Sequence, residues 1–486
     1  MTTYEAVIGL ECHVELSTAT KMFCSCANAF GAPPNSNTCP VCLGHPGTLP
    51  VPNREAIARI IKIGLALDST IAPHSLFHRK NYFYPDMPKN YQISQYDLPI
   101  CVGGHLDVEL PDASTKRVGI TRVHMEEDTG KSTHGGGSGR IHDATYAAID
   151  FNRAGVPLVE CVSEPDMRSP EEAAAYLREL RSTLEVLDVS DVKMEEGSLR
   201  CDANVSVRPA GTEALGTKVE VKNMNSIRSL ERALIYEIER QTTTLEAGVV
   251  IVQETRHWDE DSGATSSMRS KEEAFDYRYF PEPDIPAMEP SNAWIEEIRA
   301  TIPELPRGRR HRYREGGDLS EEHIKVLVGS RVLGESFDRL AAAGLGVEQK
   351  LLANFITQEV AARVNDGTLP TGEVLSHVEG FGRIVQLAQA DDISWSAAKD
   401  VLDTYLQTGE AVDATVDRLG LRQVSDAAAL GALADEVIAE NPEVAQKFRD
   451  GKENVIGFLV GQLMQKASGA ANPKIAQQLL RERLGG

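Results

Sequence analysis

The stretch from Leu10 to Leu16 alternates strictly between apolar and ionisable residues. A period of two is typical of a half-buried strand, so Glu11, His13 and Glu15 are predicted to share one face. Placing two carboxylates and an imidazole on one face carries an electrostatic cost that a cation between them would offset. The stretch therefore predicts a strand with an apolar side toward a core and a polar side toward a candidate active site.

The same alternation recurs in three further segments, at residues 191–195, 198–208 and 218–222. The polar positions of these segments are Asp191, Lys193, Glu195, Arg200, Asp202, Asn204, Ser206, Arg208, Lys218, Glu220 and Lys222. Glu196 and Gly197 form a two-residue link of the kind that joins a β-hairpin. We therefore predict several strands of one kind, with residues 191–195 and 198–208 paired as a hairpin.

The length of 486 residues is too great for a single core and predicts two or three domains. Prolines concentrate between Pro281 and Pro306, and such a rigid connector marks a boundary. Strand patterns and glycine turns dominate before this connector, whereas the chain after it is rich in Ala and Leu with helical spacing. The sequence thus predicts an α+β body followed by an all-helical region.

Helix signals occur on both sides of that connector. Ser169, Pro170 and Glu172 occupy the N-cap, N1 and N3 positions of a capping box, which predicts a helix start. The helices predicted after the connector cover residues 349–365, 373–390, 395–407 and 455–466, and a last one opens at Asn472-Pro473.

The bulk composition excludes several classes of protein. A formal charge of −22 disfavours a protein that coats nucleic acid non-specifically, because the phosphates would be repelled. No apolar run approaches the roughly 20 residues needed to span a bilayer, and the first residues lack the basic region of a secretory signal. Eight cysteines without an export signal indicate a cytoplasmic protein whose thiols are free to bind metal.

Four of those cysteines form two closely spaced pairs. Cys24 and Cys26 are separated from Cys39 and Cys42 by 12 residues that include glycine and consecutive prolines. Four thiolates from two tight knuckles fit tetrahedral Zn²⁺, and a closed four-sulfur site would be structural. The alternative is four reduced cysteines without metal.

A zinc-dependent nucleobase deaminase is a competing interpretation, because that class carries H-x-E and P-C-x-x-C motifs. His13-x-Glu15 and Cys39-x-x-Cys42 resemble them, but Thr38 replaces the proline and His13 lies in a strand pattern. Neither a Walker-type phosphate loop nor a G-x-G-x-x-G dinucleotide loop is present in the sequence. Any nucleotide would therefore be held in another way.

The polar faces of the predicted strands could hold a nucleotide through a metal ion. Mg²⁺ takes one or two protein carboxylates and completes its shell with phosphate oxygens and water. Glu11, Glu15 and the acidic segment 124–128 could supply ligands, and lysines such as Lys80 and Lys222 could neutralise phosphate charge. The alternative is a set of solvated faces with cross-strand ion pairs. Because the pattern recurs in four segments, we favour a site for a metal and a polyanion.

Several motifs together resemble the B subunit of the glutamyl-tRNA(Gln)/aspartyl-tRNA(Asn) amidotransferase family, over essentially the whole chain. The motifs that carry the resemblance are residues 7–16, 79–85, 91–95, 124–128, 191–204, 276–283, 457–464 and 471–473.

The resemblance implies a cradle-like catalytic domain built on antiparallel sheet (residues 1–292, with the zinc knuckle near 24–42), a helical domain (293–407) and a helical tail that contacts tRNA (408–486). It implies that ATP and Mg²⁺ phosphorylate the side-chain carboxylate of Glu-tRNA(Gln) or Asp-tRNA(Asn), after which ammonia displaces phosphate. It also implies a heterotrimer in which an amidase-fold A subunit makes ammonia from glutamine and a small C subunit joins the pair.

Site residues follow from the same resemblance. His13 and Glu127 would ligate Mg²⁺, with Glu11 nearby and Lys80 in the phosphate pocket of Mg-ATP. Alternation alone leaves Glu126 and Glu127 undecided, and the family motif selects Glu127. The remaining catalytic candidates are Glu160, Glu195, Asp202, Asn204 and Lys222. The tail residues expected to contact tRNA are Lys466, Lys474, Arg481 and Arg483. A tRNA-binding scaffold without catalysis is the third interpretation.

Overall fold

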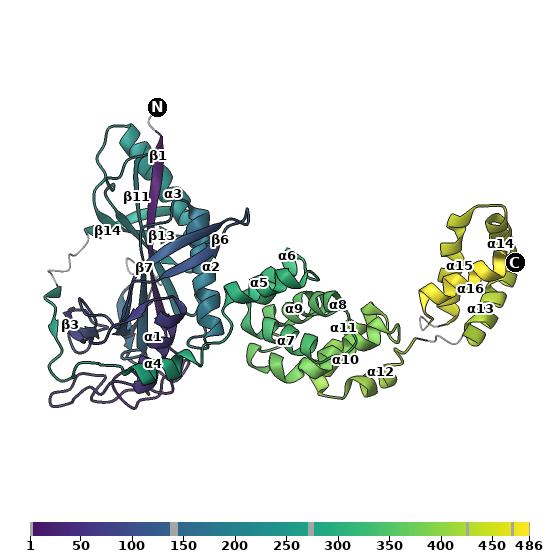
Figure 1. Cartoon of the computed structure of the whole chain (residues 1–486), viewed down its shortest axis with the longest axis horizontal. Coiled ribbons are helices and arrows are strands. Elements are labelled where there is room, and N and C mark those ends of the chain that lie inside the picture. Colours follow the sequence, from purple (N-terminus) through teal and green to yellow (C-terminus); the bar gives the residue numbers. More distant parts are fainter. Residues whose placement is uncertain (1–2, 137–143, 271–276, 424–426, 468–470, 486) are drawn as a thin grey trace. The chain divides into compact units, whose positions relative to one another are not determined.

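The computed structural model describes residues 3–136, 144–270, 277–423, 427–467 and 471–485 (Figure 1). The chain divides into two compact units, Met1–Arg309 and Arg310–Gly486, and each is described by itself. The first unit contains the β-sheets, and the regular elements described in the second unit are all helices. This division agrees with the predicted α+β body and helical region.

A mixed sheet organises the first unit. Among the described residues it has ten strands in the order β14-β13-β12-β11-β1-β10-β7-β5-β2, with β6 paired to β7. All of these pairs are antiparallel except β12 with β13. The strands are β1 (Tyr4–Glu15), β2 (Thr70–Ile71), β5 (Cys101–Val102), β6 (His105–Glu109), β7 (Thr115–Glu127), β10 (Pro157–Ser163), β11 (Leu199–Pro209), β12 (Val219–Met224), β13 (Glu254–Asp259) and β14 (Ala264–Ser270).

The helices α1 (Arg54–Ala66), α2 (Pro170–Val186) and α3 (Ile227–Glu246) share one hydrophobic core with this sheet. Even-numbered side chains of β1, such as Ile8 and Leu10, are fully buried in that core. Figure 1 shows α2 and α3 alongside the strands. Because strand side chains alternate, the odd-numbered side chains of β1 point to the opposite face of the sheet. The strand predicted over residues 10–16 is thereby confirmed.

Within the described part of the first unit, two smaller sheets accompany the main one. The first has the order β15-β3-β4 and contains β15 (Phe280–Pro281), β3 (His78–Asn81) and β4 (Tyr91–Ser94). The second pairs β8 (Lys131–Gly135) with β9 (Tyr146–Asp150). Residues of β4 lie against β7, so the first small sheet borders the main sheet near the end of β7.

The N-cap predicted at Ser169 is present at the start of α2, but the reciprocal bond of a capping box is displaced by one residue, to Arg168. The Ser169 hydroxyl accepts a hydrogen bond from the backbone N–H of Glu172 at 3.2 Å. The Glu172 carboxylate in turn accepts one from the backbone N–H of Arg168 at 2.8 Å. These bonds satisfy two donors near the helix start, which is why the helix begins where the sequence predicts.

The hairpin predicted from residues 191–195 and 198–208 is wrong in its first half. Residues 199–209 form β11, but residues 191–195 form no strand. Val192 has φ = +46°, and the Lys193 carbonyl accepts hydrogen bonds from the N–H groups of Gly197 and Ser198. This compact turn replaces a strand pairing, and Glu195 lies exposed on it.

The first unit extends beyond the predicted limit at residue 292. Helix α4 (Asn292–Arg299) places Ile298 in the core of the first unit, so the compact unit continues to Arg309. The second unit contains two separate hydrophobic cores, formed by residues between 313 and 416 and between 430 and 484. Residues between 430 and 484 therefore form a hydrophobic core of their own.

The helical elements of the C-terminal region include those predicted at 349–365, 395–407 and 455–466, the first of them with a π-helical turn in its middle. These elements are α5 (Pro306–Gly316), α6 (Glu321–Gly329), α7 (Arg331–Ala342), α8 (Gln349–Asn354), the π-turn Phe355–Val360, α9 (Ala361–Asn365), the 3₁₀ turn Thr371–His377, α10 (Val378–Gln389), α11 (Trp395–Thr408), α12 (Val412–Leu419), α13 (Ala427–Glu440), α14 (Pro442–Arg449), the 3₁₀ turn Glu453–Val455, α15 (Ile456–Lys466) and α16 (Pro473–Gly485). Within the described ranges, no helix has both the length and the apolar character required to cross a bilayer.

Candidate active site

The face of the main sheet opposite the helices carries ionisable side chains in register. His13 on β1 lies opposite Glu160 on β10, and Glu160 lies opposite His124 on β7. On the other side of β1, His13 lies opposite Arg200 on β11. Antiparallel pairing sets directly opposed side chains about 5 Å apart, so this register alone brings the two imidazoles and the carboxylate together.

His13, His124, Glu126 and Glu160 form what we call the His–Glu cluster. Glu160 Oε2 lies 3.5 Å from His13 Nε2 and 3.3 Å from His124 Nε2. Glu126 Oε1 lies 3.4 Å from His124 Nε2. His124, Glu126 and Glu160 are buried. The cluster is therefore a compact group of ionisable side chains with restricted access to water.

The buried carboxylates of the His–Glu cluster stabilise positive charge on the groups beside them. Burial alone would lower the pKa of His124, but Glu160 and Glu126 offset burial and raise it to about 9. The pKa of His13 is raised in the same way, with Glu160 opposing the effect of burial. Burial alone would raise the pKa of Glu126, yet Lys80 and His124 bring it down to about 2. The protonated imidazoles thus balance the negative charge of the carboxylates, and a bound metal ion could balance the same charge in their place.

Lys80 supplies a cation at the edge of the cluster. It belongs to β3, and its Nζ lies 3.8 Å from Glu126 Oε1 and 5.2 Å from the ring centroid of Tyr277. Burial would lower the pKa of Lys80, but Glu126 raises it above the usual lysine value. Lys80 is therefore protonated at neutral pH and can neutralise an anionic group that enters the site.

The donor set of the cluster fits a divalent cation. His13, Glu126 and Glu160 each offer one ligand atom, and these atoms all lie within 4.8 Å of one another. Two carboxylates and one imidazole suit Mg²⁺ or Mn²⁺, and three protein ligands leave coordination positions for phosphate oxygens and water.

A second row of polar residues lies two positions along β1. The Asn204 amide donates a hydrogen bond to Glu11 Oε1 at 2.8 Å, and Lys222 Nζ lies 2.5 Å from Asp202 Oδ2. Burial would lower the pKa of Lys222, but Asp202 and then Glu220 raise it. Glu11, Asp202, Asn204 and Lys222 therefore share the face that carries His13, as their alternation predicts.

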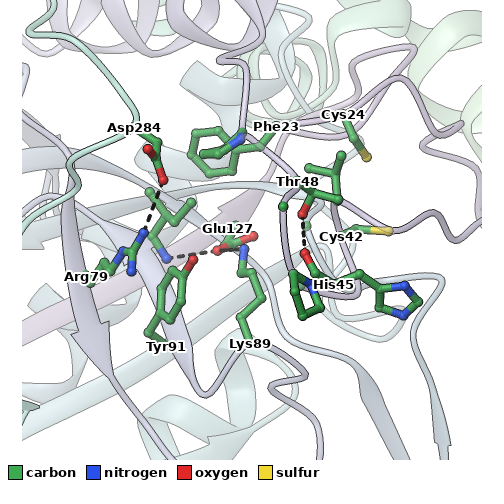
Figure 2. A pocket seen from close by; sticks show the side chains of 17 residues that line it. Phe23, Cys24, Cys42, His45, Thr48, Arg79, Lys89, Tyr91, Glu127 and Asp284 are labelled. Carbon is green, nitrogen blue, oxygen red and sulfur yellow. Dashed lines mark hydrogen bonds and ion pairs between the residues drawn. The ribbon is translucent and has the colours of Figure 1, made fainter.

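Glu127 occupies a different place from the one predicted. It follows Glu126 on β7, so its side chain points to the other side of the strand, where it accepts hydrogen bonds from Lys89 Nζ and from the backbone N–H of Ile93. Figure 2 shows Glu127 beside Lys89 and Tyr91, at a cavity of about 210 Å³ that Cys42 also lines. The structure brings Glu126, not Glu127, to His13, and a role for Glu127 stays a prediction.

Two members of the cluster, His124 and Glu126, lie in the segment 124–128 that the sequence offered as a source of ligands, but neither was chosen as a site residue. The alternation along β7 places them on the site face, and the pairing of β7 with β10 sets His124 beside Glu160. Val123 and Met125 are both buried in the hydrophobic core, so the residues between and after them face the site. Among the predicted catalytic residues, Glu195 alone lies off the strands, on the turn before β11.

The four cysteines of the predicted knuckle converge on one point. The sulfur atoms of Cys24, Cys26, Cys39 and Cys42 lie within 4.8 Å of one another. A hydrogen bond from the Cys24 thiol lowers the pKa of Cys42 to about 4. This donor set fits tetrahedral Zn²⁺ with no position left for a reactant. A deaminase would need His13 and the cysteines on one metal, whereas His13 lies with Glu126 and Glu160.

Comparisons with known proteins cover nearly the whole chain. The family model of the GatB/GatE catalytic domain matches residues 6–296, and that of the GatB domain matches residues 335–484. The chain is 51% identical over 481 residues to the B subunit of the aspartyl/glutamyl-tRNA(Asn/Gln) amidotransferase of Moorella thermoacetica, and the match covers 99% of this chain and 100% of that protein. It is 50% identical over 488 residues to the protein of the same name from Gloeothece citriformis, covering 99% of this chain and 98% of that protein. The corresponding protein of Thermosynechococcus vestitus is 50% identical over 486 residues, covering 99% and 97%.

Proposed function

This chain belongs to the B-subunit family of the aspartyl/glutamyl-tRNA(Asn/Gln) amidotransferases, and from that premise we propose that it carries the ATP-dependent step of amidation. The substrates are the misacylated tRNAs Glu-tRNA(Gln) and Asp-tRNA(Asn), and the products are Gln-tRNA(Gln) and Asn-tRNA(Asn). The observation that supports this role is the position of the His–Glu cluster beside Lys80. The cluster has side chains suited to bind a divalent cation, and the Lys80 ammonium group lies next to it.

The chemistry has two balanced steps. A side-chain carboxylate oxygen of the aminoacyl group attacks the γ-phosphorus of ATP, the bond to the bridging oxygen breaks, and ADP leaves. Ammonia then attacks the acyl carbon, the bond to the phosphate oxygen breaks, and inorganic phosphate leaves with the proton that nitrogen loses. The first step brings two anions together, so cationic groups must offset their repulsion.

The residues of this chain meet that requirement in distinct ways. His13, Glu126 and Glu160 would hold a divalent cation, which would supply charge neutralisation to the triphosphate when bound. Lys80 places its ammonium group against the same phosphates while Glu126 fixes its position at 3.8 Å. His124 holds the Glu160 carboxylate in the orientation that a ligand needs. The burial of these groups limits access of water to the activated acyl group.

The partners follow from the same premise. The relatives are named as B subunits, which supports a multi-subunit enzyme. We propose that a glutaminase A subunit supplies the ammonia and that a small C subunit completes a heterotrimer. The cysteine knuckle would hold a structural Zn²⁺. The tail would contact tRNA. Its residues Lys466, Arg481 and Arg483 each form an ion pair with an acidic residue of the tail. Contact with RNA would therefore break these ion pairs and replace the carboxylates by phosphate groups.

The test uses the complex reconstituted from this chain and its A and C partners. Release of ADP from ATP is measured with Glu-tRNA(Gln), with Asp-tRNA(Asn) and with the same tRNAs uncharged. We expect ADP release to require the misacylated forms and to be lost in His13→Ala. A non-catalytic scaffold would leave ADP release unchanged in that variant, and ADP release that ignores the aminoacyl group would contradict the proposed reaction.

A further inference from the structure

Lys21 is a fully buried lysine beside the cysteine knuckle, with a relative exposure of 0%. Its Nζ donates a hydrogen bond to the Phe151 carbonyl oxygen at 3.1 Å and another to the Cys42 sulfur at 3.8 Å. Neither of these partners is a carboxylate. Lysine is almost never fully buried unless its charge is paired. Of the two partners, only the Cys42 sulfur can carry the negative charge that such a pair requires.

Backbone hydrogen bonds fix Lys21 in this place. Its N–H donates to the carbonyl oxygen of Cys26 at 3.0 Å, and its own carbonyl oxygen accepts from the Asn53 amide at 3.3 Å. The stem of the side chain packs beside Gly155, where an added Cβ would lie 3.6 Å from Lys21 Cδ and 3.5 Å from Cys42 Cβ. Because the backbone bonds Cys26 while the side chain reaches Cys42, Lys21 connects the two pairs of cysteines.

The charge of a zinc-loaded knuckle gives this position a role. Four thiolates carry twice the charge of the Zn²⁺ that they would bind, so the zinc–thiolate group is a net anion. Cys42 is 5% exposed, so water contributes little to the solvation of its sulfur. A buried anion requires hydrogen-bond donors or a counter-charge. The Cys39 N–H donates to Cys42 Sγ at 3.1 Å, and the Lys21 ammonium group adds a full positive charge beside the same atom.

We propose that Lys21 is a positioning residue of the zinc knuckle. Its ammonium group offsets part of the negative charge of the zinc–thiolate group and holds the Cys42 sulfur toward the metal. Groups that donate hydrogen bonds to metal ligands orient those ligands and change the metal affinity. Lys21 therefore strengthens zinc binding and slows zinc release. The inference rests on the structural zinc of the proposed function and adds to it a residue outside the four-cysteine pattern.

The alternative is a lysine that serves only the loop after β9, through its hydrogen bond to the Phe151 carbonyl oxygen. The two roles have different requirements, because the loop needs a hydrogen-bond donor whereas the metal site needs a positive charge. Lys21→Gln retains an amide donor and removes the charge. Lys21→Met removes both and keeps a long side chain for the buried position. Comparison of these two variants therefore separates the two roles.

The test measures the zinc affinity of the full chain by competition with a chromophoric chelator, and the rate of zinc release to excess EDTA. Lys21→Gln and Lys21→Met should each lower zinc affinity by ~10–100-fold, because both remove the counter-charge. Lys62→Met is the matched control, since Lys62 Nζ also donates to a backbone carbonyl oxygen, that of Leu187, at 2.9 Å. With Co²⁺ in place of zinc, the sulfur-to-cobalt absorption bands should shift in the Lys21 variants and stay unchanged in the control.

Loss of zinc affinity in both Lys21 variants, with an unchanged control, supports the proposal. Loss in Lys21→Met alone would assign Lys21 to the loop and overturn it, as would wild-type affinity and wild-type cobalt bands in both variants. If Lys21→Gln does not fold, Lys21→Met is compared with Lys62→Met. Equal affinities would then overturn the proposal, and a lower affinity in Lys21→Met supports it.

Zinc binding requires no turnover, so its outcome is independent of the ATP-dependent step. A complex that binds zinc but fails to amidate tRNA would count against that step alone. A wild-type chain that binds no zinc would overturn the role of Lys21 together with the structural zinc site.

Discussion

The cysteine knuckle and the His–Glu cluster both gather side chains that could hold a metal within 4.8 Å, yet their donor sets suit different tasks. The knuckle offers four sulfur atoms, which complete a tetrahedron and exclude further ligands. The cluster offers three ligand atoms of mixed type beside the Lys80 ammonium group, and leaves positions open. The comparison teaches that the number of protein ligands and the charge around them separate a structural metal site from a reactive one.

The backbone that carries each group differs as well. The four cysteines lie on an irregular segment between β1 and α1, where they would hold the loop together. The cluster lies on three neighbouring strands whose register fixes every side chain. Catalytic geometry requires tightly fixed side chains, and a sheet provides this more directly than a loop.

The largest effect is expected when the cluster loses its central charge. Glu160→Gln keeps the shape of the side chain but leaves His13 and His124 without the carboxylate that both contact. We expect ADP release dependent on misacylated tRNA to fall by roughly 10²–10³-fold. Asp107→Asn is the matched control, because it removes another buried carboxylate, paired with Arg117, from the same sheet. Equal loss of activity in both variants would mean that the effect is only structural.

A smaller effect is expected from substitutions of the two neighbouring glutamates of β7, which should change different properties. Glu126→Gln should lower the affinity for Mn²⁺ by roughly 10–100-fold, because it removes one ligand of the cluster. Glu127→Gln should leave that affinity unchanged but lower the free energy of unfolding by about 3 kcal/mol, because Lys89 is then buried without its counter-ion. Electron paramagnetic resonance of Mn²⁺ and urea denaturation measure the two quantities. Loss of Mn²⁺ affinity in Glu127→Gln alone would reverse the assignment.

The smallest effect on activity is expected at the knuckle. Cys39→Ser removes one sulfur from the four-sulfur set and should abolish stoichiometric zinc, measured by elemental analysis. The expected cost is about 2 kcal/mol, or roughly 3 °C in Tm for a unit of this size, with activity per folded molecule retained. If the variant instead folded normally and lost all activity, the distinction between the two metal sites would fail.

Patterns between neighbouring residues were sufficient to predict the faces of β1 and the start of α2. The alternation from Leu10 to Leu16 gives the two faces of β1, and Ser169 fixes the start of α2 through its own hydrogen bond. The same alternation misassigned residues 191–195. There a positive φ at Val192 and hydrogen bonds to the Lys193 carbonyl make a turn, which a period of two cannot distinguish from a strand.

Long-range pairing decides what local rules leave open. Which glutamate of β7 meets His13 depends on the register of β7 with β10 and of β10 with β1. The pairing of β10 with β1 links residues more than 100 positions apart in the chain, and a single sequence does not state it. The family motif selects Glu127, whereas the pairing of His124 with Glu160 places Glu126 beside Lys80.

The most direct test of the central claim is the anomalous scattering of Mn²⁺ in crystals of the complex grown with Mn²⁺ and the β,γ-imido analogue of ATP. The account predicts an anomalous peak within coordination distance of His13 Nε2 and of the Glu126 and Glu160 carboxylates, next to the analogue's γ-phosphate. A peak beside Glu127 and Lys89, or none on this face of the sheet, would contradict it.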